Sequence, residues 1–257
     1  MKNFPKVTAD MFWMQMLWTF GFLGVMFIIN IIKIVIDLIQ GTEVDGYYAS
    51  VLIASNIYMV IIGLISIYFL PYYVGNGVTR KDYFKGGLLA SFGLSLAIPI
   101  ITFFISIVER FIVTNLLNLN FHVIDINEAV LDVDGNIIGD LVLSVILTPY
   151  VDPGSNWLLA MGVFSLHLFI FYLLGWFISA SFYRFGTLTG LVFILIAFII
   201  ILLKDLFLRI SLGLPLSDRF SSLASLPLGV TLPGIMLLIV FTVWGIRLLT
   251  KRVTIKM

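Results

Sequence analysis

Residues 185–203 read FGTLTGLVFILIAFIIILL, a run of 19 positions without Asp, Glu, Lys or Arg. A helix of about 20 mostly apolar residues is long enough to cross the hydrocarbon core of a bilayer. Charged residues are also absent from 11–32, 46–79, 86–108, 153–183 and 220–246. A soluble domain has no use for six such runs, so the sequence predicts an all-α membrane protein with six transmembrane helices.

The composition supports this class. Hydrophobic residues make up 61% of the 257 positions and charged residues 11%, against about 25% charged residues in a typical soluble domain. There is no cysteine, which excludes disulfides, thiolate nucleophiles and cysteine-based metal sites. Six spans use up most of the chain, so we expect residues 1–257 to form a single transmembrane domain.

The distribution of basic residues predicts the orientation, because Lys and Arg concentrate on the cytoplasmic side of membrane proteins. With six spans and an inner N-terminus, ten of the 15 basic residues lie inside. Segment 109–152 then lies outside, with seven acidic residues and Arg110 as its one basic residue. We therefore expect a multi-pass protein of the cell membrane with both termini in the cytoplasm.

Apolar and polar segments predict the order of the elements. Residues 1–15 have apolar positions at helical spacing with charges between them, which is typical of an interfacial helix. The six spans are expected at about 16–38, 47–71, 86–108, 155–181, 187–207 and 231–249.

Two segments between the spans interrupt this pattern. The extracellular segment 109–154 contains partial alternation of apolar and polar residues and an Asp-Gly turn, which predict strands within 119–152. Residues 208–230 are largely apolar but broken by glycine, proline and a charged pair. Such backbone persists at membrane depth only where protein or water satisfies it, so we expect a re-entrant or interfacial hairpin of two short helices.

A few polar residues inside or near the spans are candidates for function. Lys33 and Asp37, and also Asp205 and Arg209, are four positions apart and can form ion pairs near the outer surface. His167 is interpreted as a residue that makes a helix-packing hydrogen bond, with a proton relay as the alternative. Secondary transport is disfavoured, because no acidic residue is expected at mid-membrane.

Other local patterns predict structure rather than chemistry. Gly186 and Gly190 have the spacing of a close helix contact. The stretch Asp132-Val133-Asp134-Gly135-Asn136 is interpreted as a turn, because its glycine comes too early for a calcium loop and no Glu closes it. The sequence contains no phosphate-binding Gly-rich loop.

The loop between the second and third spans, residues 72–86, is the most polar inner segment. Thr79-Arg80-Lys81-Asp82 predicts the cap and first turn of a short helix. Tyr83 and Phe84 are then expected to be exposed, as a surface for a partner protein. The alternative is a basic anchor whose aromatic residues lie at the membrane interface.

Two inner segments resemble those of a known family. Gly77-Val78-Thr79-Arg80-Lys81-Asp82-Tyr83-Phe84 resembles the G-hydrophobic-S/T-R-K/R-x-x-F segment of export-type ABC transporter permeases of Gram-positive bacteria. Tyr183-Arg184-Phe185-Gly186, after the fourth span, is similar to a turn in the same permeases. Six spans, inner termini, an interfacial N-terminal helix and a broken hairpin before the last span also fit.

The resemblance implies a chain that is not catalytic alone and binds no cofactor. ATP and magnesium would bind a separate ABC ATP-binding subunit, which docks on a coupling helix formed by Val78 to Phe84. The second inner turn is Arg184 to Gly186, and the hairpin 208–230 helps to gate the outer side. The other implied partners are a second permease copy or a homologous permease and the lipid bilayer, with no nucleic acid.

The function implied is ATP-driven export of a hydrophobic or amphipathic substrate, such as a peptide, a lipid or an antibiotic. A stand-alone membrane enzyme is a poorer fit, because the sequence lacks paired acid and base groups or a metal cluster at one depth. A secondary carrier lacks support from an internal repeat. A sensor or scaffold stays open as an alternative.

Overall fold

The computed structural model describes residues 3–44, 46–117, 121, 144–146 and 148–254. Six helices in this part of the chain are long and apolar enough to cross a membrane. The predicted class, an all-helical protein with six potential spans, is therefore confirmed. Within the described residues the β-structure amounts to an isolated bridge between Val44 and Phe121.

The helices overlap all six predicted spans. They are α1 (Phe4–Gln40), α2 (Tyr47–Ser66), α3 (Phe69–Gly75), α4 (Arg80–Asn115), α6 (Trp157–Phe185), α7 (Thr187–Leu212) and α8 (Leu228–Lys251), with a 3-10 helix η2 (Asp218–Leu223) between the last two. The second predicted span, 47–71, is divided, because the helix breaks at Ile67 and Tyr68.

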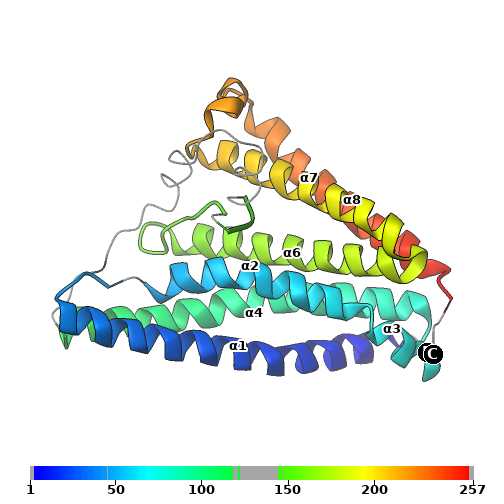
Figure 1. Cartoon of the computed structure of the whole chain (residues 1–257), viewed down its shortest axis with the longest axis horizontal. Helices are drawn as coiled ribbons and strands as arrows, with labels where there is room; N and C mark the ends of the chain where they lie inside the picture. The colour runs from blue at the N-terminus through cyan, green and yellow to red at the C-terminus, as the bar shows by residue number, and fades with distance from the viewer. Residues whose placement is uncertain (1–2, 45, 118–120, 122–143, 147, 255–257) are drawn as a thin grey trace.

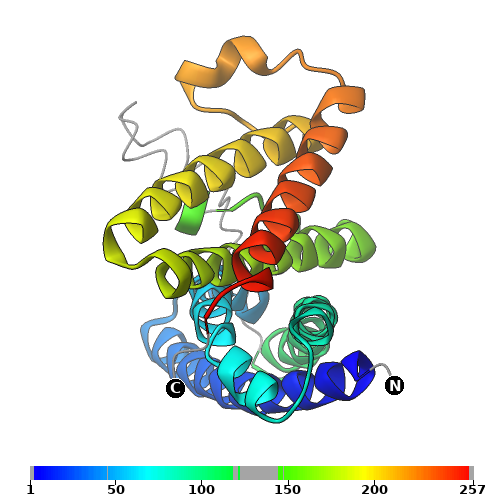
Figure 2. The same ribbon diagram turned by 90° about the vertical axis from the view of Figure 1, so that its right-hand side faces the viewer.

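The helices converge at one end of the molecule, and α7 and α8 lean away from α6 toward the other end (Figure 1). Helix α6 packs against α2, α4, α7 and α8. Helix α3 and both ends of the chain lie at the convergent end, which faces the viewer in Figure 2. We call it the inner end, because the basic residues predict that it faces the cytoplasm, and we call the opposite end the outer end.

Helix α6 is the centre of the bundle. In the apolar stretch that makes α6 a candidate span, 61% of the residues are buried inside the protein, against 11% in the corresponding stretch of α1. Its buried side chains include the large rings of Phe164, Phe171, Tyr172 and Trp176. Helix α1 exposes most of its apolar side chains instead, as expected for a helix that faces lipid.

Helices α2 and α6 approach each other backbone to backbone. A Cβ atom added to Gly63 would lie 2.1 Å from the carbonyl oxygen of Tyr172, and one added to Gly175 would lie 2.2 Å from that of Val60. Small residues at helix contacts permit such an approach. Gly190 also makes a close contact, with the Phe182 ring.

The predicted interfacial helix is not a separate element. Helix α1 is continuous over 37 residues, or about 55 Å at 1.5 Å per residue, which exceeds the hydrocarbon thickness of about 30 Å. Val7, Met11 and Gln15 are buried inside the bundle. The helical periodicity at the N-terminus therefore reflects packing against protein rather than a helix lying on the membrane.

The prediction for residues 208–230 was also wrong in its details. Helix α7 continues to Leu212, and η2 lies in the connection to α8. Residues 221–225 are exposed. The segment thus contains one short 3-10 helix between α7 and α8 rather than the two short helices that were predicted.

The strands predicted within 119–152 fall mainly on residues 122–143, which lie outside the described part of the chain. The predicted turn at Asp132 to Asn136 lies there as well.

Candidate functional site

The segment predicted as a coupling helix forms the beginning of α4. Thr79 is the N-cap, and its hydroxyl oxygen accepts a hydrogen bond from the Asp82 backbone N–H at 3.1 Å. Such a bond satisfies one of the free N–H groups of a first helical turn. The cap is therefore as predicted, but the helix that it starts is the third span itself, which continues to Asn115.

Tyr83 and Phe84 are not the exposed pair that the sequence predicted. Tyr83 is fully buried, with its ring 5.7 Å from that of Trp176 and its hydroxyl donating to the Ser66 carbonyl at 2.6 Å. Phe84 is half-buried, and the Arg247 guanidinium lies 5.3 Å from its ring centre. Both rings face other helices, because the polar segment before them is the first turn of a packed span.

The exposed aromatic residues of this loop lie on and beside α3. Tyr68 and Tyr72 are 71% and 61% exposed. The opposite side of α3 is attached to the bundle: the Tyr73 hydroxyl donates to a carboxylate oxygen of Asp10 at 2.6 Å, and its ring lies 6.2 Å from that of Tyr83. Helix α3 is therefore a short, anchored helix with an aromatic outer edge.

The second inner turn, Arg184 to Gly186, connects α6 to α7. Gly186 has a φ of 83°, a left-handed conformation that glycine adopts without steric cost. Its role is to make this turn, and the contact predicted from Gly186 and Gly190 involves only Gly190. Arg184 donates from Nη1 to the carbonyl oxygens of Leu248 and Leu249 near the end of α8, where a cation also complements the helix dipole.

Helix α8 connects the two inner motifs. Arg247 on this helix donates from Nη1 to the Arg80 carbonyl at 3.3 Å, while the helix end accepts from Arg184. The end of α8 is thus hydrogen-bonded both to the first turn of α4 and to the turn between α6 and α7. Figure 2 shows the inner end, where these segments lie, from the front.

Charged side chains are buried between α6 and α7, a group we call the buried charge cluster: His167, Lys204, Asp205 and Arg209. The Asp205 carboxylate lies 2.8 Å from Arg209 Nε and 3.9 Å from Lys204 Nζ, which in turn lies 3.0 Å from His167 Nδ1. Lys204 is eight residues before the end of α7, or about 12 Å along the helix. These side chains are therefore buried inside the bundle rather than exposed at its surface.

The hydrogen bonds of His167 define its tautomer. The ring Nε2 lies 3.2 Å from the Pro149 carbonyl oxygen. Because a carbonyl can only accept, Nε2 carries the proton, and Nδ1 accepts from Lys204. His167 therefore joins α6, α7 and the chain before α6. The Lys33–Asp37 pair stays a prediction, and the Asp37 carboxylate accepts from the Thr42 hydroxyl at 2.9 Å.

The chain before α6 enters the bundle, and we call residues 144–146 and 148–149 the re-entrant segment. Asn56 donates from Nδ2 to the Val145 carbonyl and to Thr148 Oγ1, both at 3.2 Å. Asn56 is nine residues into α2, about 14 Å along the helix. A helical turn at 144–146 and irregular backbone at 148–149 thus pack against Asn56 inside the bundle, where protein groups satisfy them.

Changing Asn56 to alanine should loosen the re-entrant segment. Two buried acceptors would lose their donor, at a cost of about 1–2 kcal/mol. Amide hydrogen exchange at residues 144–146 and 148 is expected to rise about tenfold, since 1.4 kcal/mol corresponds to a factor of ten. The control is Ser50→Ala, because the Ser50 hydroxyl bonds only to Gly46 of its own first turn. Equal protection in both variants would show that Asn56 does not hold the segment.

No family model, curated protein or solved structure matches this chain. The resemblance to ABC permeases therefore rests on the two inner motifs and the topology. Among the residues that the structure describes, no group of three His, Asp or Glu side chains is placed to hold a metal ion.

Proposed function

We propose that this chain is the membrane subunit of an ATP-driven exporter in the cell membrane, and that a separate ATP-hydrolysing subunit docks on its inner end. The observation that carries the proposal is α3, a short helix between the second and third spans. It exposes Tyr72 and anchors Tyr73 in the bundle. Tyrosine is enriched among the residues that dominate binding at protein interfaces.

Force applied to α3 has a continuous path into the bundle. Tyr73 connects α3 to Asp10 of α1, and its ring packs near that of Tyr83 on α4. The Tyr83 hydroxyl bonds to the Ser66 carbonyl at the end of α2. The hydroxyls of Ser66 and Tyr172 are 2.5 Å apart, and this pair extends the path to α6. Such buried polar contacts are costly to break, so these helix ends are expected to move together.

The outer gate in this proposal is the re-entrant segment and not the connection 208–230. The re-entrant segment is held between α2 and α6 by Asn56 and His167, whereas residues 221–225 are exposed. A shift of α6 relative to α2 would release those bonds and open a path outward for a hydrophobic or amphipathic substrate. A second permease, identical or homologous, completes the path.

The first test is purification of the tagged chain from its native membranes in mild detergent, with mass spectrometry of what accompanies it. An ATP-binding subunit in amounts comparable to the bait is the expected result. Recovery of the chain without such a subunit, under conditions that preserve other membrane complexes, would contradict the proposal.

The sharper test is Tyr72→Ala. Removing this exposed ring should reduce association with the ATP-binding subunit at least tenfold, as expected for a hot-spot aromatic residue, and should change unfolding by no more than about 0.5 kcal/mol. The control is Phe104→Ala, because Phe104 is 64% exposed on α4, a comparable exposure away from α3. Equal losses of association in both variants would argue against docking on α3. Tyr83 is unsuitable for this test, because its ring is fully buried.

A proton-coupled carrier is the second candidate, and the buried charge cluster favours it. Ionisable residues inside a bundle commonly mark proton or ion pathways. Transport by the purified chain in vesicles with a pH gradient, without ATP or any partner, would select this function over the first.

A further inference from the structure

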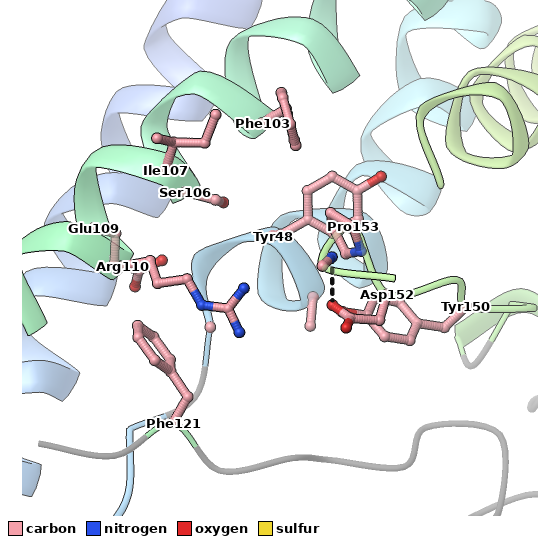
Figure 3. A pocket seen from close by; sticks show the side chains of 13 residues that line it. Tyr48, Phe103, Ser106, Ile107, Glu109, Arg110, Phe121, Tyr150, Asp152 and Pro153 are labelled. Atoms are coloured by element: carbon pink, nitrogen blue, oxygen red, sulfur yellow. Dashed lines mark hydrogen bonds between the residues drawn. The ribbon is translucent and has the colours of Figure 1, made fainter. Parts of the chain in front are cut away.

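A cavity lies at the outer end between α2, the end of α4 and the loop before α6 (Figure 3). Its volume is about 340 Å³, within the range of about 300–1,000 Å³ that small-molecule sites occupy. Phe103 and Ile107 of α4 supply apolar wall, and Tyr48, Tyr150 and Asp152 supply polar groups. It is remote from the docking surface on α3, which lies at the inner end.

Two hydroxyl groups on the wall lack partners. The side chain of Tyr48 is 96% buried, given a relative exposure of 4%, yet its phenol oxygen has no hydrogen-bond partner among the described residues. The same holds within this part of the chain for the buried hydroxyl oxygen of Ser106, one helical turn after Phe103. Buried polar groups are nearly always satisfied by protein, water or a ligand, so these two are placed to bind one.

Opposite charges flank the mouth. A Cβ atom added to Gly154 would lie 2.9 Å from a carboxylate oxygen of Asp152 and 3.1 Å from Nη1 of Arg110, so both groups border this glycine. The Arg110 guanidinium extends toward the centre of the site, near Phe121 (Figure 3). Within the described residues, the Asp152 carboxylate accepts one hydrogen bond, from the Gly154 backbone N–H at 3.1 Å. A carboxylate can accept several, so it can also bind a ligand.

Glu109 has a separate task. Its carboxylate accepts from Asn30 Nδ2 at 2.6 Å and from the Tyr47 backbone N–H at 2.9 Å, so it caps the beginning of α2. The Tyr150 phenol stays protonated at neutral pH, because burial and the nearby Asp152 raise its pKa to about 12. The charges available to a ligand are therefore one guanidinium and one carboxylate.

We propose that this cavity binds the zwitterionic head group of an amphiphile, with an anionic phosphate at Arg110 and an ammonium group at Asp152. The Ser106 hydroxyl, on the same side of the site as the Arg110 guanidinium, hydrogen-bonds to the phosphate, whereas the Tyr48 hydroxyl points away from that guanidinium (Figure 3). The aromatic rings around the site suit an ammonium group, which is attracted to ring faces. Arginine suits a phosphate because its guanidinium forms bidentate hydrogen bonds.

The position of the site explains why the ligand is an amphiphile. Trp157, 54% exposed at the start of α6, stacks on the ring of Phe103, with the ring centres 6.1 Å apart. Exposed tryptophans gather at the level of lipid headgroups. An apolar tail can then follow the exposed surface of α4, where Phe104 and Phe111 are exposed. This site is independent of the proposed function, because no ATP-binding subunit takes part.

The test is native mass spectrometry of the full chain in a non-ionic detergent, titrated with lysophosphatidylcholine. Lysophosphatidic acid provides the phosphate without the ammonium group, and an alkyltrimethylammonium ion provides the reverse. One tightly bound lysophosphatidylcholine is expected, with each single-charge probe binding at least tenfold more weakly.

The variants locate the site. Arg110→Gln should weaken binding of lysophosphatidylcholine at least tenfold. Ser106→Ala, which deletes only a hydroxyl that has no partner among the described residues, should weaken it about fivefold. Arg252→Gln, which removes an exposed cation at the inner end, should leave binding unchanged. Ala49→Leu narrows the cavity without altering charge and should also reduce binding. Equal affinity in Arg110→Gln and wild-type protein, or equal binding of all three probes, would overturn the proposal.

Discussion

Replacing Gly63 or Gly175 with alanine should force α2 and α6 apart and cost about 3 kcal/mol of the free energy of unfolding, the upper end for overpacked sites. The new methyl groups would lie 2.1 Å and 2.2 Å from backbone carbonyl oxygens. Backbone atoms cannot move aside as a flexible side chain can, so the helices themselves must separate. Reversible unfolding in detergent measures the loss.

The controls for these variants are two glycines at which alanine should not destabilise the protein. Gly21 and Gly162 lie inside helices with nothing within 4 Å of an added Cβ atom. Alanine at either position should be neutral or stabilising by up to about 1 kcal/mol, because alanine is the better helix former. Destabilisation by all four substitutions alike would point to a general cost of alanine and not to a close helix contact.

The double variant of Gly63 and Gly175 tests the mechanism. Both alanines impose the same separation of the helices, so their combined cost should fall well short of the sum. The hydroxyl groups of Ser66 and Tyr172, 2.5 Å apart across the same contact, should separate as well. Full additivity would mean that each methyl group acts locally.

The helices were predictable because a span leaves a long signal. A charge-free run of about 20 residues has few alternatives to a membrane helix, and Thr79 followed by Asp82 marks a helix start through local chemistry alone. The close contact between α2 and α6 was not predicted from the sequence. Gly175 and Ser179 have the small-xxx-small spacing that predicts it, but nothing in α2 identifies Gly63 as the partner.

The inner loop shows why exposure was harder to predict than helix type. Charged neighbours made Tyr83 look like a surface residue, but its burial depends on the direction in which α4 leaves the loop, toward Trp176. Tertiary geometry of this kind is not encoded in local spacing. The same reason explains the re-entrant segment. A packing hydrogen bond was predicted for His167, but its partner at Pro149 and the role of Asn56 depend on how the chain before α6 enters between α2 and α6.

Asp205→Asn should be among the most destabilising changes, with a cost of about 3–5 kcal/mol, because it removes the buried carboxylate that pairs with Arg209 and Lys204. Asp205 lies 2.8 Å from Arg209 and 3.9 Å from Lys204, and all three side chains are buried. Asparagine keeps the volume and removes the charge, so the loss measures electrostatics rather than packing. Thermal or denaturant unfolding in detergent is the measurement.

The control for Asp205 is Asp37→Asn at the outer end of α1. Its carboxylate accepts from the Thr42 hydroxyl at an exposed position, so the change should cost no more than about 1 kcal/mol. Comparable losses at the two sites would mean that burial of the cluster carries no special cost.

A second substitution separates stability from function. Adding Lys204→Met to Asp205→Asn removes a buried cation that has lost this carboxylate. Stability should then recover in part, because replacing buried charges with apolar side chains is often neutral. Export, measured beside unfolding, then decides what the cluster does. If the double variant regains stability and still fails to export, the charges serve transport, since their contribution to folding has been replaced. If export returns together with stability, the cluster serves to hold α6, α7 and the re-entrant segment in place.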